Sequence, residues 1–272
     1  MYHNNQYNEI YHRFRQQKQS IFAIFTAKSC VDENNSNQMI QMKSILVLIL
    51  GLISFYVQAQ ILDQIDVTNH EDGQASIKFQ QFIAEGRVIS GMKTGLWISR
   101  MPSGMPHEVT SFKNNLKEGI SLEFDRSGYL QQEANYKDNL LHGVLKTWKP
   151  GGRLTLEENY TDGQLDGKRQ VFYERGQLQE ESFYKNGERH GKSAWYDEAG
   201  NLMATYQYEN GLFEGVQQTY YSDGAVKSKR SYHKNKLNGE AKDYYPDGRL
   251  KAEAVYIMDK LASEWKKNEP AN

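Results

Sequence analysis

The chain has 272 residues, of which 38% are hydrophobic and 12% aromatic, and it contains 22 glycines, 18 tyrosines and 5 prolines. Its formal net charge of −1 provides no overall positive field, which excludes a nucleic acid as the expected partner. Abundant Tyr and Gly favour short strands joined by tight turns over long helices, and so predict an all-β fold.

The N-terminal part contains a predicted export signal. Lys43 precedes an apolar run from Ile45 to Val57, and Val57 and Ala59 occupy positions −3 and −1 of a cleavage site before Gln60. This pattern predicts a signal peptide over 42–59. We interpret residues 1–41, which are rich in Asn and Gln, as an unstructured upstream extension that reflects a misassigned start, with translation beginning at Met42.

The predicted location is therefore the periplasm, the cell surface or the exterior, after cleavage near Ala59. The alternative is a protein anchored in the membrane by residues 45–57, with the basic residues upstream on the cytoplasmic side. The single cysteine, Cys30, precedes the predicted cleavage site, so no disulfide is expected in the exported chain.

After a predicted N-terminal cap and half repeat at 60–94, the sequence repeats every 24 residues. Seven units fill 95–262, and a C-terminal half repeat or cap follows at 263–272. Each unit opens with a glycine: Gly95, Gly119, Gly143, Gly167, Gly191, Gly215 and Gly239. A second glycine follows nine residues later: Gly104, Gly128, Gly152, Gly176, Gly200, Gly224 and Gly248.

Two further columns keep the same phase. Seventeen residues after the first glycine stands an aromatic residue: Phe112, Tyr136, Tyr160, Tyr184, Tyr208, Tyr232 and Tyr256. Three residues later stands an Asn, Gly or Asp: Asn115, Asn139, Gly163, Gly187, Gly211, Asn235 and Asp259. We expect the aromatic column to pack each unit on the next, because an isolated hairpin is only marginally stable.

The two turn signals in each unit predict a hairpin. Dipeptides such as Asp223-Gly224 supply the positive φ of a tight turn, and Asn, Gly and Asp tolerate the left-handed region at the second turn. Stacked hairpins give an elongated single antiparallel β-meander ribbon. The rival architecture is a parallel β-solenoid with one coil per repeat, which would need nearly continuous apolar ladders and would not need two turn signals nine residues apart.

The segments "YKNGERHGKSAWYDEAGNL" and "YENGLFEGVQQTYYSDGAV" resemble the MORN-repeat variant of bacterial proteins over roughly 86–265. The family includes the YwqK-type antitoxin component of a toxin–antitoxin module, and eukaryotic MORN arrays are associated with phospholipids and scaffolding. The resemblance implies a rigid β-ribbon that binds something and no catalytic residue. The predicted export signal departs from a cytoplasmic antitoxin.

The sequence shows no chemistry of an enzyme, and no cofactor or metal is predicted. His142 and His190 share one phase two units apart, too far to hold one metal ion. The glutamates at 133, 157, 181 and 253 share a column, which we interpret as a solvated face rather than a catalytic pair.

The predicted binding residues lie six residues after the first glycine and in a nearby basic group. Strand alternation predicts that Tyr173, Tyr221 and Tyr245 are exposed if their neighbours Phe172, Tyr220 and Tyr244 are in the core. The basic group includes Lys229 and Arg230. Exposed tyrosines suit contacts with another protein.

We therefore predict a non-enzymatic, exported module that binds a protein partner, in its sharpest form a toxin in an antitoxin or immunity role. The alternatives are a module that binds phospholipid at the membrane surface, which the net charge disfavours, and an envelope scaffold that associates with itself.

Overall fold

The computed structural model describes residues 60–268. These residues belong to one compact unit, which begins at Gln60. The predicted upstream extension at 1–41 and the predicted signal peptide at 42–59 lie outside the described residues. Between residues 60 and 268, no helix is long and apolar enough to cross a membrane.

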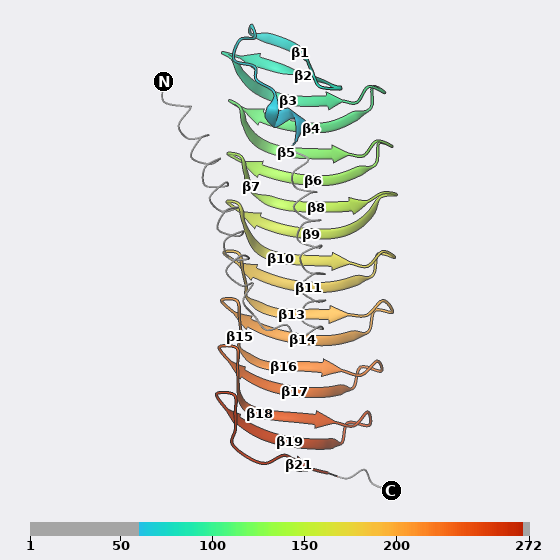
Figure 1. Ribbon diagram of the computed structural model, residues 1–272, viewed down its shortest axis with the longest axis vertical. Helices are drawn as coiled ribbons and strands as arrows, with labels where there is room; N and C mark the ends of the chain where they lie inside the picture. The colour runs from blue at the N-terminus through green and yellow to red at the C-terminus, as the bar shows by residue number, and fades with distance from the viewer. Residues whose placement is uncertain (1–59, 269–272) are drawn as a thin grey trace, which may run out of the picture. The chain divides into compact units, whose positions relative to one another are not determined.

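Residues 60–268 form one sheet of 21 strands, preceded by the short 3-10 helix η1 (Ile61–Gln64) (Figure 1). The strands of the first half are β1 (Gly73–Phe79), β2 (Phe82–Ile89), β3 (Met92–Arg100), β4 (Pro106–Lys113), β5 (Leu116–Phe124), β6 (Leu130–Lys137), β7 (Leu140–Leu141), β8 (Gly143–Lys149), β9 (Arg153–Thr161) and β10 (Gln164–Phe172). The strands of the second half are β11 (Leu178–Lys185), β12 (Glu188–Arg189), β13 (Gly191–Tyr196), β14 (Leu202–Glu209), β15 (Leu212–Phe213), β16 (Gly215–Tyr220), β17 (Val226–His233), β18 (Lys236–Tyr244), β19 (Leu250–Ile257), β20 (Lys260–Leu261) and β21 (Lys266–Lys267).

The strands are connected as a meander. Each hairpin pairs antiparallel with the hairpin before and after it. The two-residue strands β7, β12 and β15 each end shortly before the first glycine of a unit, as where β12 and β13 both pair with β11. Figure 1 shows the hairpins side by side from β1 to β21. The predicted all-β ribbon, a single antiparallel meander of 24-residue hairpins, is therefore confirmed.

The Asn/Gly/Asp column forms the two-residue turns. Both central residues have positive φ, 52° at Asn186 and 83° at Gly187, as a type I′ turn requires. The Gly187 N–H also donates to the carbonyl of Leu165 in the preceding unit (2.8 Å). Where the tip is Asn115, its Oδ1 in addition accepts the N–H of Lys93 (2.7 Å). The residues of this column therefore do more than adopt a positive φ: their amide groups also link each turn to the preceding unit by a hydrogen bond.

The second glycine closes the other turn. Gly200 has a φ of 87°, and its N–H donates to the carbonyl of Asp197 (3.0 Å). The Asp197 side chain accepts the N–H groups of Ala199 (2.9 Å) and Asn201 (2.8 Å). The pairing of β13 with β14 shifts register beside this turn, between Trp195 and Tyr196, which is the bulge that such connections commonly contain.

The sheet has two faces, which we name by their residues. Successive strand residues point to opposite faces, and residues directly opposite across a pair share one face. The strap face carries Glu108 and Thr110 of β4 and Arg169 of β10. The reverse face carries Val109 of β4 and Lys229 of β17.

Among residues 60–268, the compact apolar core lies at the N-terminal end. Residues 60–67, which we call the strap, lie against the strap face of β3 to β5. The apolar side chains of this core are Ile61, Leu62, Ile65, Val67, Phe82, Ala84, Val88, Trp97, Met101 and Phe112. Trp97 is fully buried and packs over Gly86, where an added Cβ would lie 2.2 Å from a ring atom.

The strap also buries charged groups of the sheet. Glu108 is fully buried and accepts the backbone N–H of Leu62 (3.0 Å), and burial raises its pKa to about 7. Lys93 donates its ammonium to the carbonyls of Leu62 and Ile65, and Lys117 pairs with Asp63 at 2.8 Å. These polar contacts fix the position of the strap on the sheet.

Candidate functional site

The three predicted binding tyrosines connect neighbouring units. Tyr173 donates its hydroxyl to the carbonyl of Tyr196 (2.9 Å), and Tyr221 donates to Tyr244 (2.8 Å). Tyr245 donates to the carbonyl of Asn268 (3.0 Å). All three residues are half-buried, as are Phe172, Tyr220 and Tyr244 at the neighbouring positions. Each of the three tyrosines lies at the start of a turn, where a long side chain reaches the next hairpin. Their role in binding stays a prediction.

Lys229 and Arg230 lie on opposite faces of β17, so the structure separates the two predicted basic residues. The ammonium of Lys229 lies 5.9 Å from the ring centre of Tyr244 on the reverse face. Arg230 points to the strap face, where its guanidinium donates to Asp243 (2.7 Å) and lies over the ring of Trp265. The five predicted residues therefore do not form one site.

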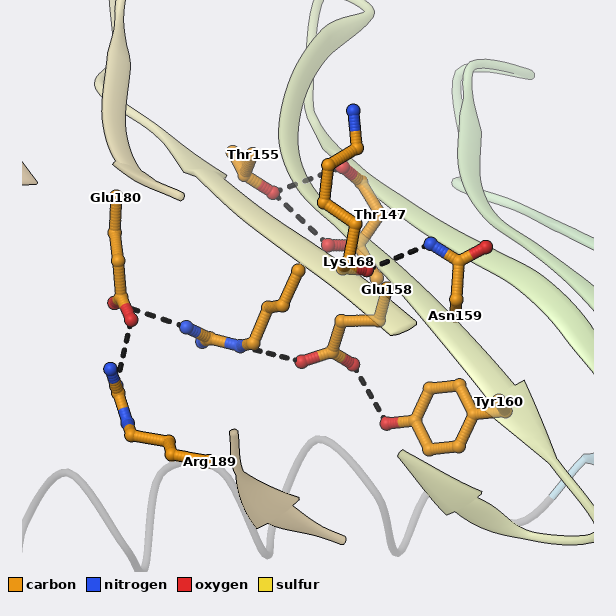
Figure 2. Close-up of polar contacts among 9 residues, drawn as sticks. Thr147, Thr155, Glu158, Asn159, Tyr160, Lys168, Glu180 and Arg189 are labelled. Carbon is orange, nitrogen blue, oxygen red and sulfur yellow. Dashed lines mark hydrogen bonds and ion pairs between the residues drawn. The ribbon is translucent and has the colours of Figure 1, made fainter. Parts of the chain in front are cut away.

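The strap face of the central units carries a row of alternating charges on β9 to β12. Arg169 lies between two carboxylates, with Nε 2.8 Å from Glu158 and Nη1 3.1 Å from Glu180. Glu180 also pairs with Arg189 at 2.7 Å, and Glu158 accepts the hydroxyl of Tyr160 (2.7 Å) (Figure 2). Two arginines thus balance two glutamates across four successive strands.

This balance makes the row a structural element. The carboxylates have side-chain exposures of 11% and 13%, and each is bonded to at least one guanidinium. Breaking such a partly buried pair leaves a desolvated charge without its partner, which is costly. The row therefore holds Arg189 in a fixed position at the end of the network.

Arg189 is surrounded by aromatic rings. Its guanidinium carbon lies 5.5 Å from the ring centre of Tyr184, 5.3 Å from Trp195 and 5.4 Å from Tyr208. These distances are typical of cation–π contacts. The Arg189 side chain is 26% exposed, so its guanidinium contacts the rings and also remains accessible to solvent.

The rings continue along the strap face towards β17. Tyr206 contacts Trp195 and Phe213, with ring centres 4.8 and 5.4 Å apart. Phe213 also contacts Tyr208 and Tyr232 at 4.9 and 5.4 Å. We call this set the aromatic surface: Tyr184, Arg189, Trp195, Tyr206, Tyr208, Phe213 and Tyr232. Each member is half-buried, so mutual packing orients the set while leaving part of every side chain accessible.

The periodic pattern does not by itself predict the aromatic surface, because only three of its residues belong to a constant column. The tyrosines at 184, 208 and 232 belong to the predicted aromatic column. Trp195, Tyr206 and Phe213 instead replace smaller or charged residues of other units, as Tyr206 replaces Thr110 and Phe213 replaces Lys117. Large residues at variable positions beside the constant column were the available signal.

The described residues provide no metal centre. Within 60–268, no three or more His, Cys, Asp or Glu side chains are grouped so that they could hold a metal ion. His142 and His233 each pair with a single carboxylate, Asp162 at 3.2 Å and Glu214 at 2.9 Å.

Comparison with protein-family models matches the MORN repeat variant to five segments, 117–138, 165–186, 189–210, 213–234 and 237–258. These segments together make up less than half of the chain. They contain every residue of the aromatic surface, which therefore lies on segments that match the MORN repeat variant. The unmatched segment 139–164 forms the same hairpin in β8 and β9, so the architecture extends beyond the matched repeats. A comparison with curated proteins gave no match.

Proposed function

We propose that this protein is a non-enzymatic binding module whose aromatic surface contacts a protein partner. The observation that carries the proposal is the position of Arg189 among Tyr184, Trp195 and Tyr208, half-buried and fixed by Glu180. Tyr, Trp and Arg are the residues that most often dominate the binding energy of protein interfaces.

The rigidity of the aromatic surface supports a binding role. Its rings are held by edge and tilted contacts on a hydrogen-bonded sheet, so little side-chain freedom remains to be lost when a partner binds. MORN repeats are generally non-enzymatic, and a repeat array that binds a partner is the role they suggest.

The sharpest form of the proposal is an immunity or antitoxin role outside the cytoplasm, in which the partner is a toxin. It joins two expectations from sequence, the YwqK-type resemblance and the predicted signal peptide at 42–59. Sequencing of the mature N-terminus together with cell fractionation tests the location. A cytoplasmic protein that begins at Met42 or earlier would contradict the predicted export.

The test of binding uses three versions of the tagged chain expressed in its own cells. They are the unaltered chain, Tyr206→Ala combined with Phe213→Ala, and the matched control Met203→Ala combined with Val216→Ala on the reverse face of the same units. We expect a partner that co-purifies in stoichiometric amount with the unaltered chain and the control but not with the aromatic variant.

The purified partner then gives a quantitative measurement. Titration calorimetry should show an affinity at least ~10-fold lower for the aromatic variant, in line with the loss of interface aromatic residues. Equal affinities for all three chains would refute this surface. The prediction that Tyr221 and Tyr245 contact the partner is tested in the same titration with both residues changed to Ala.

A further inference from the structure

The reverse face carries one unbroken row of directly opposed side chains from β1 to β21. Each member lies opposite the next on the neighbouring strand: Ser76, Glu85, Ile98, Val109, Leu122, Glu133, Lys146, Glu157, Gln170, Glu181, Ala194, Thr205, Gln218, Lys229, Lys242, Glu253 and Lys266. Most charged neighbours in this row have opposite signs, as Glu133, Lys146 and Glu157 do. Lys229 and Lys242 do not.

Directly opposed like charges destabilise a sheet, so the pair needs an explanation. Among all paired strand residues in 60–268, only two other pairs have the same sign, Glu108 with Glu123 and Lys149 with Arg153. In both pairs, another segment of the chain supplies hydrogen-bond partners to the two charged groups. The strap donates the Leu62 N–H to Glu108 and the Gln60 amide to Glu123.

The second pair follows the same rule. Glu174, from the next hairpin, accepts the ammonium of Lys149 with its carboxylate (2.6 Å) and the guanidinium of Arg153 with its carbonyl (3.2 Å). In these two cases, a like-charged pair across two strands marks the place where a further segment supplies the complementary groups.

Within residues 60–268, the Lys229–Lys242 pair is compensated at Lys242 alone. Lys242 pairs with Glu240 on its own strand (2.7 Å) and lies opposite Glu253 of β19, whereas the ammonium of Lys229 has no hydrogen bond or ion pair with any described residue. Two more lysines beside it, Lys227 and Lys251, also lack a carboxylate partner there and lie over the rings of Tyr221 and Tyr245.

We propose that these residues form a docking site for an acidic segment of a partner protein. We call the site the lysine–tyrosine patch: Tyr221, Lys227, Lys229, Lys242, Tyr244, Tyr245 and Lys251. Carboxylates of the partner lie between Lys229, Lys227 and Lys251, and relieve the repulsion between Lys229 and Lys242. The tyrosine rings provide the apolar contact beside the charges.

Charge favours a peptide over a lipid surface. Glu240, Asp247 and Glu253 alternate with the lysines at this end of the sheet, and a flat anionic bilayer would be pressed against them as well. An extended acidic segment can place its carboxylates at the lysines alone. The patch is on the face opposite the aromatic surface, so this inference is independent of the function proposed above.

The experiment measures fluorescence anisotropy of a fluorescein-labelled octaglutamate peptide titrated with the full chain at low salt, about 50 mM, where screening is weak. The patch variant changes Lys227, Lys229 and Lys251 to Ala. The matched control changes Lys113, Lys137 and Lys185 to Ala, which are exposed lysines of other units, and so alters the net charge by the same amount.

The patch variant should bind at least ~10-fold more weakly than the unaltered chain, whereas the control should stay within about twofold. The melting temperature of the patch variant should be unchanged or higher, because a like-charged pair is removed. The single variant Lys229→Met retains the aliphatic contact with Tyr244 and provides the same comparison if the triple variant folds poorly.

Three results would overturn the proposal. One is equal weakening in the patch variant and the control, which indicates non-specific attraction. Another is no peptide binding by the unaltered chain. The third is patch-dependent binding to vesicles of phosphatidylglycerol and phosphatidylcholine without binding to the peptide, which would assign the patch to lipid.

Discussion

Two regions of the sheet solve the same stability problem differently. At the N-terminal end the strap covers β3 to β5 and creates a two-layer core with fully buried Leu62 and Trp97. From β11 to β17 the sheet is a single layer, and half-buried rings pack along the strap face without a covering segment within the described residues. The comparison indicates two ways to stabilise a unit: a strap can pack on its strap face, or side chains of neighbouring units can pack against its own.

The largest effect is expected when the strap loses its most deeply buried apolar side chain. Leu62→Ala should reduce the free energy of unfolding by about 2–5 kcal/mol at the N-terminal end, because Leu62 is completely buried. Hydrogen exchange should show faster exchange of amides in β2 to β5 and little change in β16 to β19. Leu96→Ala, at a side chain that is 51% exposed on the reverse face, is the control.

The second prediction concerns pH at the strap. Burial raises the pKa of Glu108 from 4.5 to about 7, so between these values the folded state binds a proton that the unfolded state has released. Stability at this end therefore falls as pH rises from 4.5 to 7, by at most about 3 kcal/mol, and is constant above that.

Denaturant titrations at pH 5 and pH 8 measure this effect. Glu108→Gln keeps the shape of the side chain and cannot ionise, so its stability should vary less across the same range. An unaltered chain that is equally stable at both values would contradict the raised pKa.

A third, smaller effect is expected under Trp97. Gly86→Ala places a methyl group 2.2 Å from the indole, so the ring must move, at a cost of about 1–3 kcal/mol. Thermal unfolding followed by Trp fluorescence measures it. Ser76→Ala on the exposed side of β1 should have almost no effect, and equal changes in the two variants would argue against close packing at Gly86.

The smallest expected effect concerns a hydrogen bond between neighbouring units. Tyr221→Phe removes only the hydroxyl that donates to Tyr244, and should cost about 0.5–1.5 kcal/mol. Tyr129→Phe is the control, since this ring is 52% exposed. If both variants melt at the temperature of the unaltered chain, the bond between units contributes nothing measurable.

The sequence predicted the fold well because both turns require residues with unusual backbone freedom. Asn186-Gly187 and Asp223-Gly224 each specify a tight turn with positive φ. Equivalent turns recur every 24 residues, so the same hairpin forms in each unit. The strap could not be predicted in the same way. Its contacts with Lys93, Glu108 and Lys117 join residues far apart in the sequence, and nothing in the periodic pattern specifies them.

The candidate sites were predictable only in part. Alternation correctly separates the two faces of a strand, but the exposure of Tyr221 depends on where its long side chain goes at the turn, which alternation does not determine. Lys229 and Lys242 look unremarkable along the chain. Their repulsion becomes visible only when the register places them opposite each other.

The turn tips have a wider consequence. Because the amides of Gly187 and Asn115 bond to carbonyls of the preceding unit, the spacing of the hairpins is set by main-chain groups and one small side chain. Residues on both faces can then be exchanged without altering that spacing. Whole units could be duplicated, lost or recombined in such a chain, and each new arrangement would display a different chemical pattern on an unchanged frame.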